Sequence, residues 1–121
     1  MKTKMRKKIY LYIIVSLLGI FIFFVHQNKK YIARFIFFQL TDSTQYSVGM
    51  DVNEFYKLHK GMSKKEVRMR LGPPLSISTG PVNEQWWSYT KPGSTGNYRI
   101  LSVLFDASGK SIEIVDEYYF D

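Results

Sequence analysis

The chain has 121 residues, of which 17 are Lys or Arg and 10 are Asp or Glu, and its formal net charge is +7. It contains no cysteine, which excludes disulfides, thiolate metal sites, cysteine nucleophiles and the lipid-modified cysteine of a bacterial lipoprotein. Seven of the cations and none of the acids lie among the first 30 residues, whereas residues 31–121 hold ten of each sign. The excess charge is therefore confined to the N-terminus.

A run of 17 residues without charge, 9–25, follows the N-terminal basic group. It lies at the short end of the roughly 17 to 25 residues that cross a hydrocarbon core, so His26 and Gln27 are expected to reach the far interface. The positive-inside bias predicts a cytoplasmic N-terminus and an exported C-terminal domain. A cleavable signal peptide is the alternative, but residues 23–27 lack the small side chains of a cleavage site. We therefore expect residues 1–30 to form an uncleaved, single-pass signal anchor.

Residues 31–50 are expected to form a juxtamembrane segment and a linker. The first part, 31–40, is apolar but carries Arg34, and it is too short and too charged to cross a bilayer. It either continues the anchor helix or lies along the membrane surface, or it packs on the folded domain through Phe35, Phe37, Phe38 and Leu40. Residues 41–50 are mostly polar and predict a linker.

Two short helices open the domain predicted at 51–121. The first has apolar residues at 52, 55 and 58, which share one helical face, and Gly61 is expected to end it in a left-handed conformation. Ser63 and Glu66 form a capping box at the start of the second helix. The Gly-Pro-Pro run at 72–74 ends that helix.

Beyond residue 74 the apolar period changes to two, which predicts strands at 75–79, 84–90, 98–106 and 111–119. Neighbouring strands joined by turns this short must be antiparallel. The predicted fold class is therefore α+β, with two short helices packed on one face of an antiparallel β-meander of three or four strands.

The order of these features carries a family resemblance over about half of the chain. The residues that carry it are Gly61, Met62, Ser63, Glu66, Val67, Leu71, Gly72, Pro73, Trp87, Tyr89, Leu101, Val103, Phe105, Asp106 and Gly109. Together they resemble the SmpA/OmlA (BamE-like) domain family, whose fold is related to that of β-lactamase inhibitor proteins. The resemblance implies the fold above. The family includes a small lipoprotein of the outer-membrane β-barrel assembly machinery. Members of that family are lipid-anchored to the outer membrane, whereas a transmembrane anchor is expected here. For a helix-anchored relative, the resemblance implies the inner (cytoplasmic) membrane and a periplasmic C-terminal domain.

Catalysis is the weakest hypothesis for this chain. The two histidines, His26 and His59, have no motif partner, and His59 is typical of a solvated residue at a helix end. The carboxylates of the last strand lack the spacing of a metal loop, and their alternation is typical of a charged edge that discourages aggregation. The sequence predicts a protein that is not an enzyme and has no cofactor or metal.

A basic cluster on the two helices is a candidate for binding an anionic surface near the membrane. Only Glu66 is expected to offset its charge. The alternative is that these cations form the solvent faces of two short helices. Nucleic acid is not an expected partner of an exported domain. The cluster consists of Lys57, Lys60, Lys64, Lys65, Arg68 and Arg70.

The second face of the predicted sheet is unusually apolar. A sheet that is covered on one side should present apolar residues on that side only, yet alternation places apolar residues on both. A face rich in Trp and Tyr is typical of a protein contact. The alternative is that 31–40 or the loop 91–97 covers it. The candidate contact residues are Trp86, Tyr98, Ile100, Leu104, Val115 and Tyr119.

These observations favour a membrane-anchored, non-catalytic protein-binding module of the bacterial cell envelope, such as an assembly or scaffold factor for envelope proteins. Two alternatives remain. The fold relationship to β-lactamase inhibitor proteins permits an inhibitor of an exported enzyme, and the basic cluster permits a structural tether that binds anionic lipid.

Overall fold

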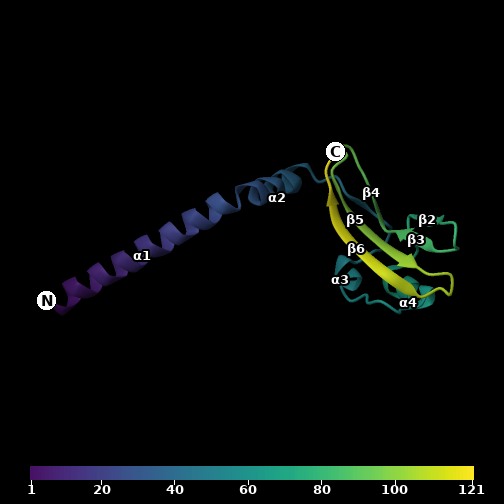
Figure 1. The fold of residues 1–121 in the computed structure, drawn as a ribbon, viewed down its shortest axis with the longest axis horizontal. Helices are drawn as coiled ribbons and strands as arrows, with labels where there is room; N and C mark the ends of the chain where they lie inside the picture. Colours follow the sequence, from purple (N-terminus) through teal and green to yellow (C-terminus); the bar gives the residue numbers. More distant parts are fainter. The chain divides into compact units, whose positions relative to one another are not determined.

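The computed structural model describes residues 1–121 and divides into two compact units, Met1–Phe37 and Phe38–Asp121. In the first unit, α1 (Lys2–Gln27) is a helix of 26 residues with no buried side chain. It is long and apolar enough to cross a membrane, a property that signal sequences share. Asn28 interrupts the helix, and its side-chain amide donates to the carbonyl of Phe24 at 2.9 Å. A second helix, α2 (Lys29–Thr41), follows (Figure 1).

The second unit contains helices and antiparallel strands, which confirms the predicted α+β class. The order along the chain is β1 (Gln45–Tyr46), α3 (Val52–Phe55), α4 (Lys64–Leu71), β2 (Ser76–Thr79), β3 (Gln85–Ser88), β4 (Thr90–Lys91), β5 (Tyr98–Phe105) and β6 (Ser111–Tyr119). The strands form two sheets. One has four strands in the order β2-β3-β5-β6, and the other pairs β1 with β4. Figure 1 shows β5 and β6 as the two long strands of this unit.

The hydrophobic core lies between the two short helices and one face of the larger sheet. From the helices and the loop between them come Phe55, Met62, Val67 and Leu71, and each is at most 3 % exposed. From the sheet come Trp87, Leu101, Val103 and Phe105. Tyr89 joins this cluster, and its hydroxyl donates to the carbonyl of Gly72 at 3.1 Å.

The capping box predicted for the second helix is present. The hydroxyl oxygen of Ser63 accepts from the backbone N–H of Glu66 at 3.2 Å, and the Glu66 carboxylate accepts from the backbone N–H of Ser63 at 2.7 Å. The helix ends at Leu71, and Gly72 follows with φ of 78°. Met62 precedes the cap and Val67 follows it, and both are buried, as a hydrophobic staple requires.

The first helix is shorter than predicted. Asp51 caps it, accepting from the backbone N–H of Asn53 at 2.8 Å, and it ends at Phe55. Gly61 has the expected positive φ, 90°, but does not cap this helix. Its N–H instead donates to the carbonyl of Ser111 at 2.7 Å, which ties the segment between the helices to β6.

Residues 41–50, predicted to be a linker, belong to the folded unit. Gln45 and Tyr46 pair with Lys91 and Thr90, and the N–H of Ser47 donates to the carbonyl of Tyr89 at 2.9 Å. The compact unit therefore begins at Phe38 and not at residue 51. A strand of two residues is too short to show a period of two, which is why its polar sequence predicts a linker.

The strand predicted at 84–90 is divided between the two sheets. β3 ends at Ser88, and Thr90 begins β4. The sheet is therefore not a simple meander, because the chain leaves it between β3 and β5 to pair with β1. Tyr89 lies at the division, where its N–H donates to the carbonyl of Leu101 at 2.9 Å.

Candidate interaction surfaces

The strand register places all six predicted contact residues on one face of the larger sheet. Tyr98 pairs with Tyr119, and Leu104 pairs with Trp86. Ile100 and Val115 lie between these pairs at even spacing along β5 and β6. Because successive residues of a strand point to opposite faces, the six side chains share a face. We call this the outer face, defined by Trp86, Tyr98, Ile100, Leu104, Val115 and Tyr119.

The outer face lies opposite the core. The core residues Leu101, Val103 and Phe105 alternate with the outer-face residues of β5 and are fully buried. The helices α3 and α4 contribute their buried side chains to that core, so neither helix packs on the outer face.

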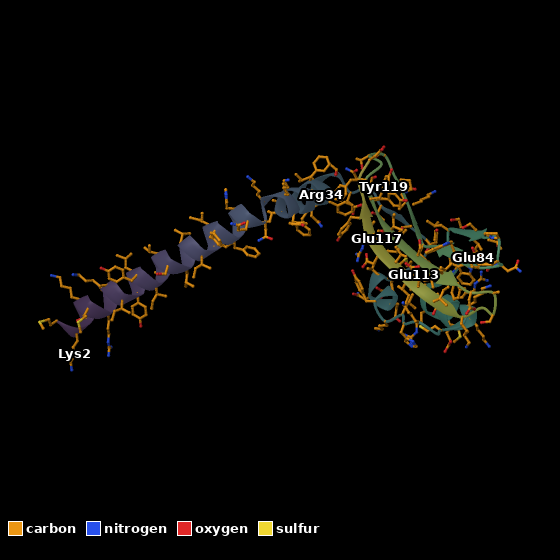
Figure 2. The ribbon with its side chains drawn as sticks, in the orientation of Figure 1. Lys2, Arg34, Glu84, Glu113, Glu117 and Tyr119 are labelled. Carbon is orange, nitrogen blue, oxygen red and sulfur yellow. The ribbon has the colours of Figure 1, made fainter.

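Five of the six outer-face side chains are half-buried, and Tyr119 is 47 % exposed. The rings of Tyr98 and Tyr119 are in contact, with centroids 5.6 Å apart. On β6, two carboxylates alternate with the apolar residues on this face, because Glu113 pairs with Leu104 and Glu117 pairs with Ile100. Figure 2 shows Glu113, Glu117 and Tyr119 spaced along this strand. The surface is therefore aromatic and apolar, with exposed acidic groups at one side.

A β-bulge between Leu104 and Phe105 sets the register of β6. Phe105 pairs with Ser111 and Leu104 pairs with Glu113, so Ile112 has no partner on β5. The bulge places Ser111 on the core side, where its hydroxyl accepts from the N–H of Met62 at 3.0 Å and donates to the carbonyl of His59 at 3.0 Å. In a strand without a bulge, alternation would place Ser111 on the same face as Val115 and Tyr119. The bulge allows Ser111 to face the core while Val115 and Tyr119 remain on the outer face.

Phe38, the buried residue of segment 31–40, does not lie over the outer face. Phe38 is 2 % exposed, and its ring centroid lies 4.1 Å from that of Tyr118. Tyr118 pairs with Arg99 and alternates with Tyr119, so it lies on the core side of β6. The loop 91–97 bonds instead to residues 41–43, with the amide of Asn97 donating to the hydroxyl of Thr41 at 2.8 Å. Of the expected arrangements, packing on the domain is shown for Phe38, whereas the side chains of Phe35, Phe37 and Leu40 are more than half exposed.

Arg99, which the sequence did not single out, lies on the core side of β5 near Tyr118. The guanidinium of Arg99 donates from Nε and Nη2 to the two carboxylate oxygens of Asp116, each at 2.6 Å. It also donates to the Tyr56 hydroxyl, and it lies 5.3 Å from the Tyr56 ring and 5.8 Å from the Tyr118 ring. The hydrogen bonds with Asp116 raise the pKa of Arg99 above its ordinary value. A single cation within an apolar strand is the sequence signal that could have indicated this site.

Two residues of the basic cluster form ion pairs within the domain. Glu54, which the sequence analysis did not count, pairs with Lys57 at 2.5 Å and with Arg70 at 3.4 Å. The hydrogen bond from Lys57 lowers the pKa of Glu54. Glu66, expected to offset the cluster, is engaged by Ser63 in the capping box, and the hydrogen bond from the Ser63 backbone lowers its pKa.

Two further cations of this cluster lie over aromatic rings of the core. Arg68 lies 5.4 Å from the Trp87 ring, and Lys64 lies 5.9 Å from the Phe105 ring. Their stems therefore cover the core at the helix side, which is a packing role that long cationic side chains commonly have. Lys60 and Lys65 are exposed and make no ion pair. The structure thus gives four of the six cations local partners.

His59 is exposed and lies beside a backbone carbonyl. Its Nδ1 is 3.1 Å from the carbonyl oxygen of Lys60, and its backbone N–H donates to the sulfur of Met62 at 3.4 Å. No group of three His, Cys, Asp or Glu side chains lies close enough together to hold a metal ion.

No protein-family model matches the chain, and no curated protein matches it.

Proposed function

We propose that this protein is a membrane-anchored, non-catalytic protein-binding module of the bacterial cell envelope, and that its outer face is the contact surface. In this proposal α1 crosses the inner membrane once, with the N-terminus in the cytoplasm and the SmpA/OmlA-like domain in the periplasm. The domain binds another envelope protein, in the manner of an assembly or scaffold factor.

The observation that carries the proposal is the apolar character of both faces of one sheet. The core accounts for one face, with Leu101, Val103 and Phe105 fully buried. Trp86, Tyr98, Ile100 and Leu104 lie on the other, where no helix of the domain packs. Tyr and Trp supply large contact areas with little loss of conformational entropy, so they are common in the centres of protein interfaces.

The charges near the outer face favour a protein partner over anionic lipid at this surface. Glu113 and Glu117 are exposed and lie on the outer side of β6. An anionic membrane surface would repel them, whereas a partner with Lys or Arg beside apolar residues would complement them.

The anchor is supported by the composition of α1. The helix has no buried side chain and spans 26 residues, and its cations lie at the N-terminal end. A cluster of cations before the apolar run favours retention of that end in the cytoplasm.

In-cell photo-crosslinking tests the proposed contact. A photo-reactive residue at Trp86 should give one discrete crosslinked partner, identified by mass spectrometry of the membrane fraction. Lys65 on α4 is the control position, and the same partner should be absent there. Tyr119→Ala, which changes a half-exposed side chain, should reduce the crosslink from Trp86 without changing the thermal unfolding midpoint. Equal crosslinking from Trp86 and Lys65, or no effect of Tyr119→Ala and of Ile100→Asp, would contradict the assignment.

A further inference from the structure

The helix α2 combines exposed apolar side chains with a purely cationic charge. It spans 13 residues, contains Lys29, Lys30 and Arg34, and has no acidic residue. Its exposed apolar side chains include Tyr31 at 75 %, Phe35 at 57 %, Ile36 at 52 % and Leu40 at 81 %. Such exposure is unusual for a folded protein in water and indicates a surface that something else covers.

α2 carries an apolar row on the side opposite Phe38. Residues of a helix are separated by about 100° around its axis, so residues four apart lie in a row. Ile32, Ile36 and Leu40 form such a row, and Ile36 and Leu40 each lie about 160° around the axis from Phe38. Phe38 is buried against Tyr118 and Phe120. Phe38 therefore packs on the domain at the C-terminal end of the helix, while Ile36 and Leu40 on the opposite side are exposed and Ile32 is half-buried.

The position of α2 along the chain favours lipid as the occupant of that side. Only Asn28 separates Lys29 from the end of α1. A helix of 13 residues is about 20 Å long, so if α1 spans the bilayer, every residue of α2 lies within about that distance of the membrane surface. Amphipathic helices with cations and large apolar side chains bind in the headgroup region, and anionic lipids strengthen the binding.

We propose that α2 lies in the headgroup region of the membrane, with Ile32, Ile36 and Leu40 facing the acyl chains and Lys29 and Lys30 near the phosphates of anionic lipids. This inference rests on the proposed membrane anchor. It does not depend on the proposed protein contact at the outer face.

The absence of native cysteine makes site-specific labelling simple. The full chain is reconstituted into lipid nanodiscs with one nitroxide label at a time, at Ile36→Cys, Leu40→Cys, Val48→Cys or Ile14→Cys. Val48 is 90 % exposed in the folded unit and serves as the water-exposed control. Ile14 lies within α1 and reports the anchor itself. Power saturation then compares collision of each label with oxygen, which partitions into lipid, and with a water-soluble nickel chelate.

The labels at Ile36 and Leu40 should collide preferentially with oxygen, while the label at Val48 should collide preferentially with the nickel chelate. The preference at Ile36 and Leu40 should increase when phosphatidylglycerol replaces part of the phosphatidylcholine. Replacing both Lys29→Gln and Lys30→Gln should remove that dependence on lipid charge, whereas Lys60→Gln with Lys65→Gln should leave it unchanged.

Water exposure at Ile36 and Leu40 with lipid exposure at Ile14 would overturn the inference and leave the anchor intact. Water exposure at all three positions would overturn the anchor as well. Protection of Leu40 from both reagents, with spectral broadening that grows with the number of chains per nanodisc, would assign the face to a second copy and contradict the lipid assignment. Unchanged fluorescence of Trp86 and Trp87 in each variant would show that the domain remains folded.

Discussion

Replacing Phe38 by alanine tests whether the folded unit extends into α2. Phe38 is 2 % exposed, and its ring centroid lies 4.1 Å from that of Tyr118 and 5.5 Å from that of Phe120. Removing a buried phenylalanine from a core costs about 3–5 kcal/mol, of which part is the cavity that remains. Tyr118 is 47 % exposed, so it can move into the space and reduce that cavity. We therefore expect Phe38→Ala to lower the free energy of unfolding by about 2–3 kcal/mol.

Urea unfolding of the full chain in detergent, followed by tryptophan fluorescence, measures this loss. Trp87 is 4 % exposed in the core and reports the folded state. Phe35→Ala is the matched control, because Phe35 lies in the same helix but is 57 % exposed. That variant should unfold within about 0.5 kcal/mol of the unmodified protein. If Phe38→Ala were as stable as Phe35→Ala, the contacts of Phe38 would contribute nothing, and the folded unit would begin after α2.

Three further predictions concern the stability of the domain. Asp116→Asn should lower the free energy of unfolding by about 1–2 kcal/mol, because the partly exposed Arg99 loses its hydrogen bonds to a charged acceptor. Glu117→Gln on the outer face is its control and should change that free energy by less than about 0.5 kcal/mol in the same urea titration. Burial raises the pKa of Tyr89 to about 12, whereas an unfolded tyrosine titrates near about 10. Stability should therefore be fully present below about pH 10 and fall as the pH rises through about 12, and Tyr89→Phe should flatten that decline in unfolding curves at alkaline pH. A decline of equal slope in both proteins would contradict this assignment. Finally, Ser63→Ala should cost about 1 kcal/mol through loss of the helix cap, while Ser63→Thr should retain most of the stability. Equal losses in the two variants, measured by thermal unfolding, would show that the cap hydroxyl is not the cause.

The parts of the fold that were predictable from sequence are those specified by adjacent residues. Ser63 and Glu66 are three residues apart, and the side chain of each accepts a hydrogen bond from the backbone N–H of the other. Their pattern is therefore sufficient to locate the start of α4. The alternation along β5 likewise assigns Leu101 to the core and Ile100 to the outer face, because a strand has a period of two. Both features depend only on residues that are close in the sequence.

The parts that were not predictable depend on contacts between distant residues. β1 exists because Gln45 and Tyr46 pair with Thr90 and Lys91, more than 40 residues away. Arg99 is held by Asp116 of β6 and by Tyr56, which directly follows α3, and nothing near Arg99 in the sequence indicates these partners.

The outer face shows both situations. Alternation alone grouped Trp86 with Ile100 and Leu104, and the register agrees. The grouping of Val115 and Tyr119 with them also holds, but the sequence contains no sign of the bulge at Leu104 on which the register of β6 depends. Alternation within each strand is therefore sufficient to propose which residues share a surface. How neighbouring strands align with one another depends on the pairing between them, which the structure gives.

The two faces of the strand β6 differ in their contacts. From Ile114 onward, its even-numbered residues face the core side, where Ile114 packs against the core, Asp116 holds Arg99 and Tyr118 contacts Phe38. Its odd-numbered residues lie on the outer face beside the proposed contact. Substitutions at even positions should therefore lower the free energy of unfolding, because they remove packing or ion-pair contacts. Substitutions at odd positions should alter crosslinking from Trp86 at nearly constant stability. A single strand thus supplies its own controls, since neighbouring residues share the same backbone environment and differ in the side of the sheet that they face.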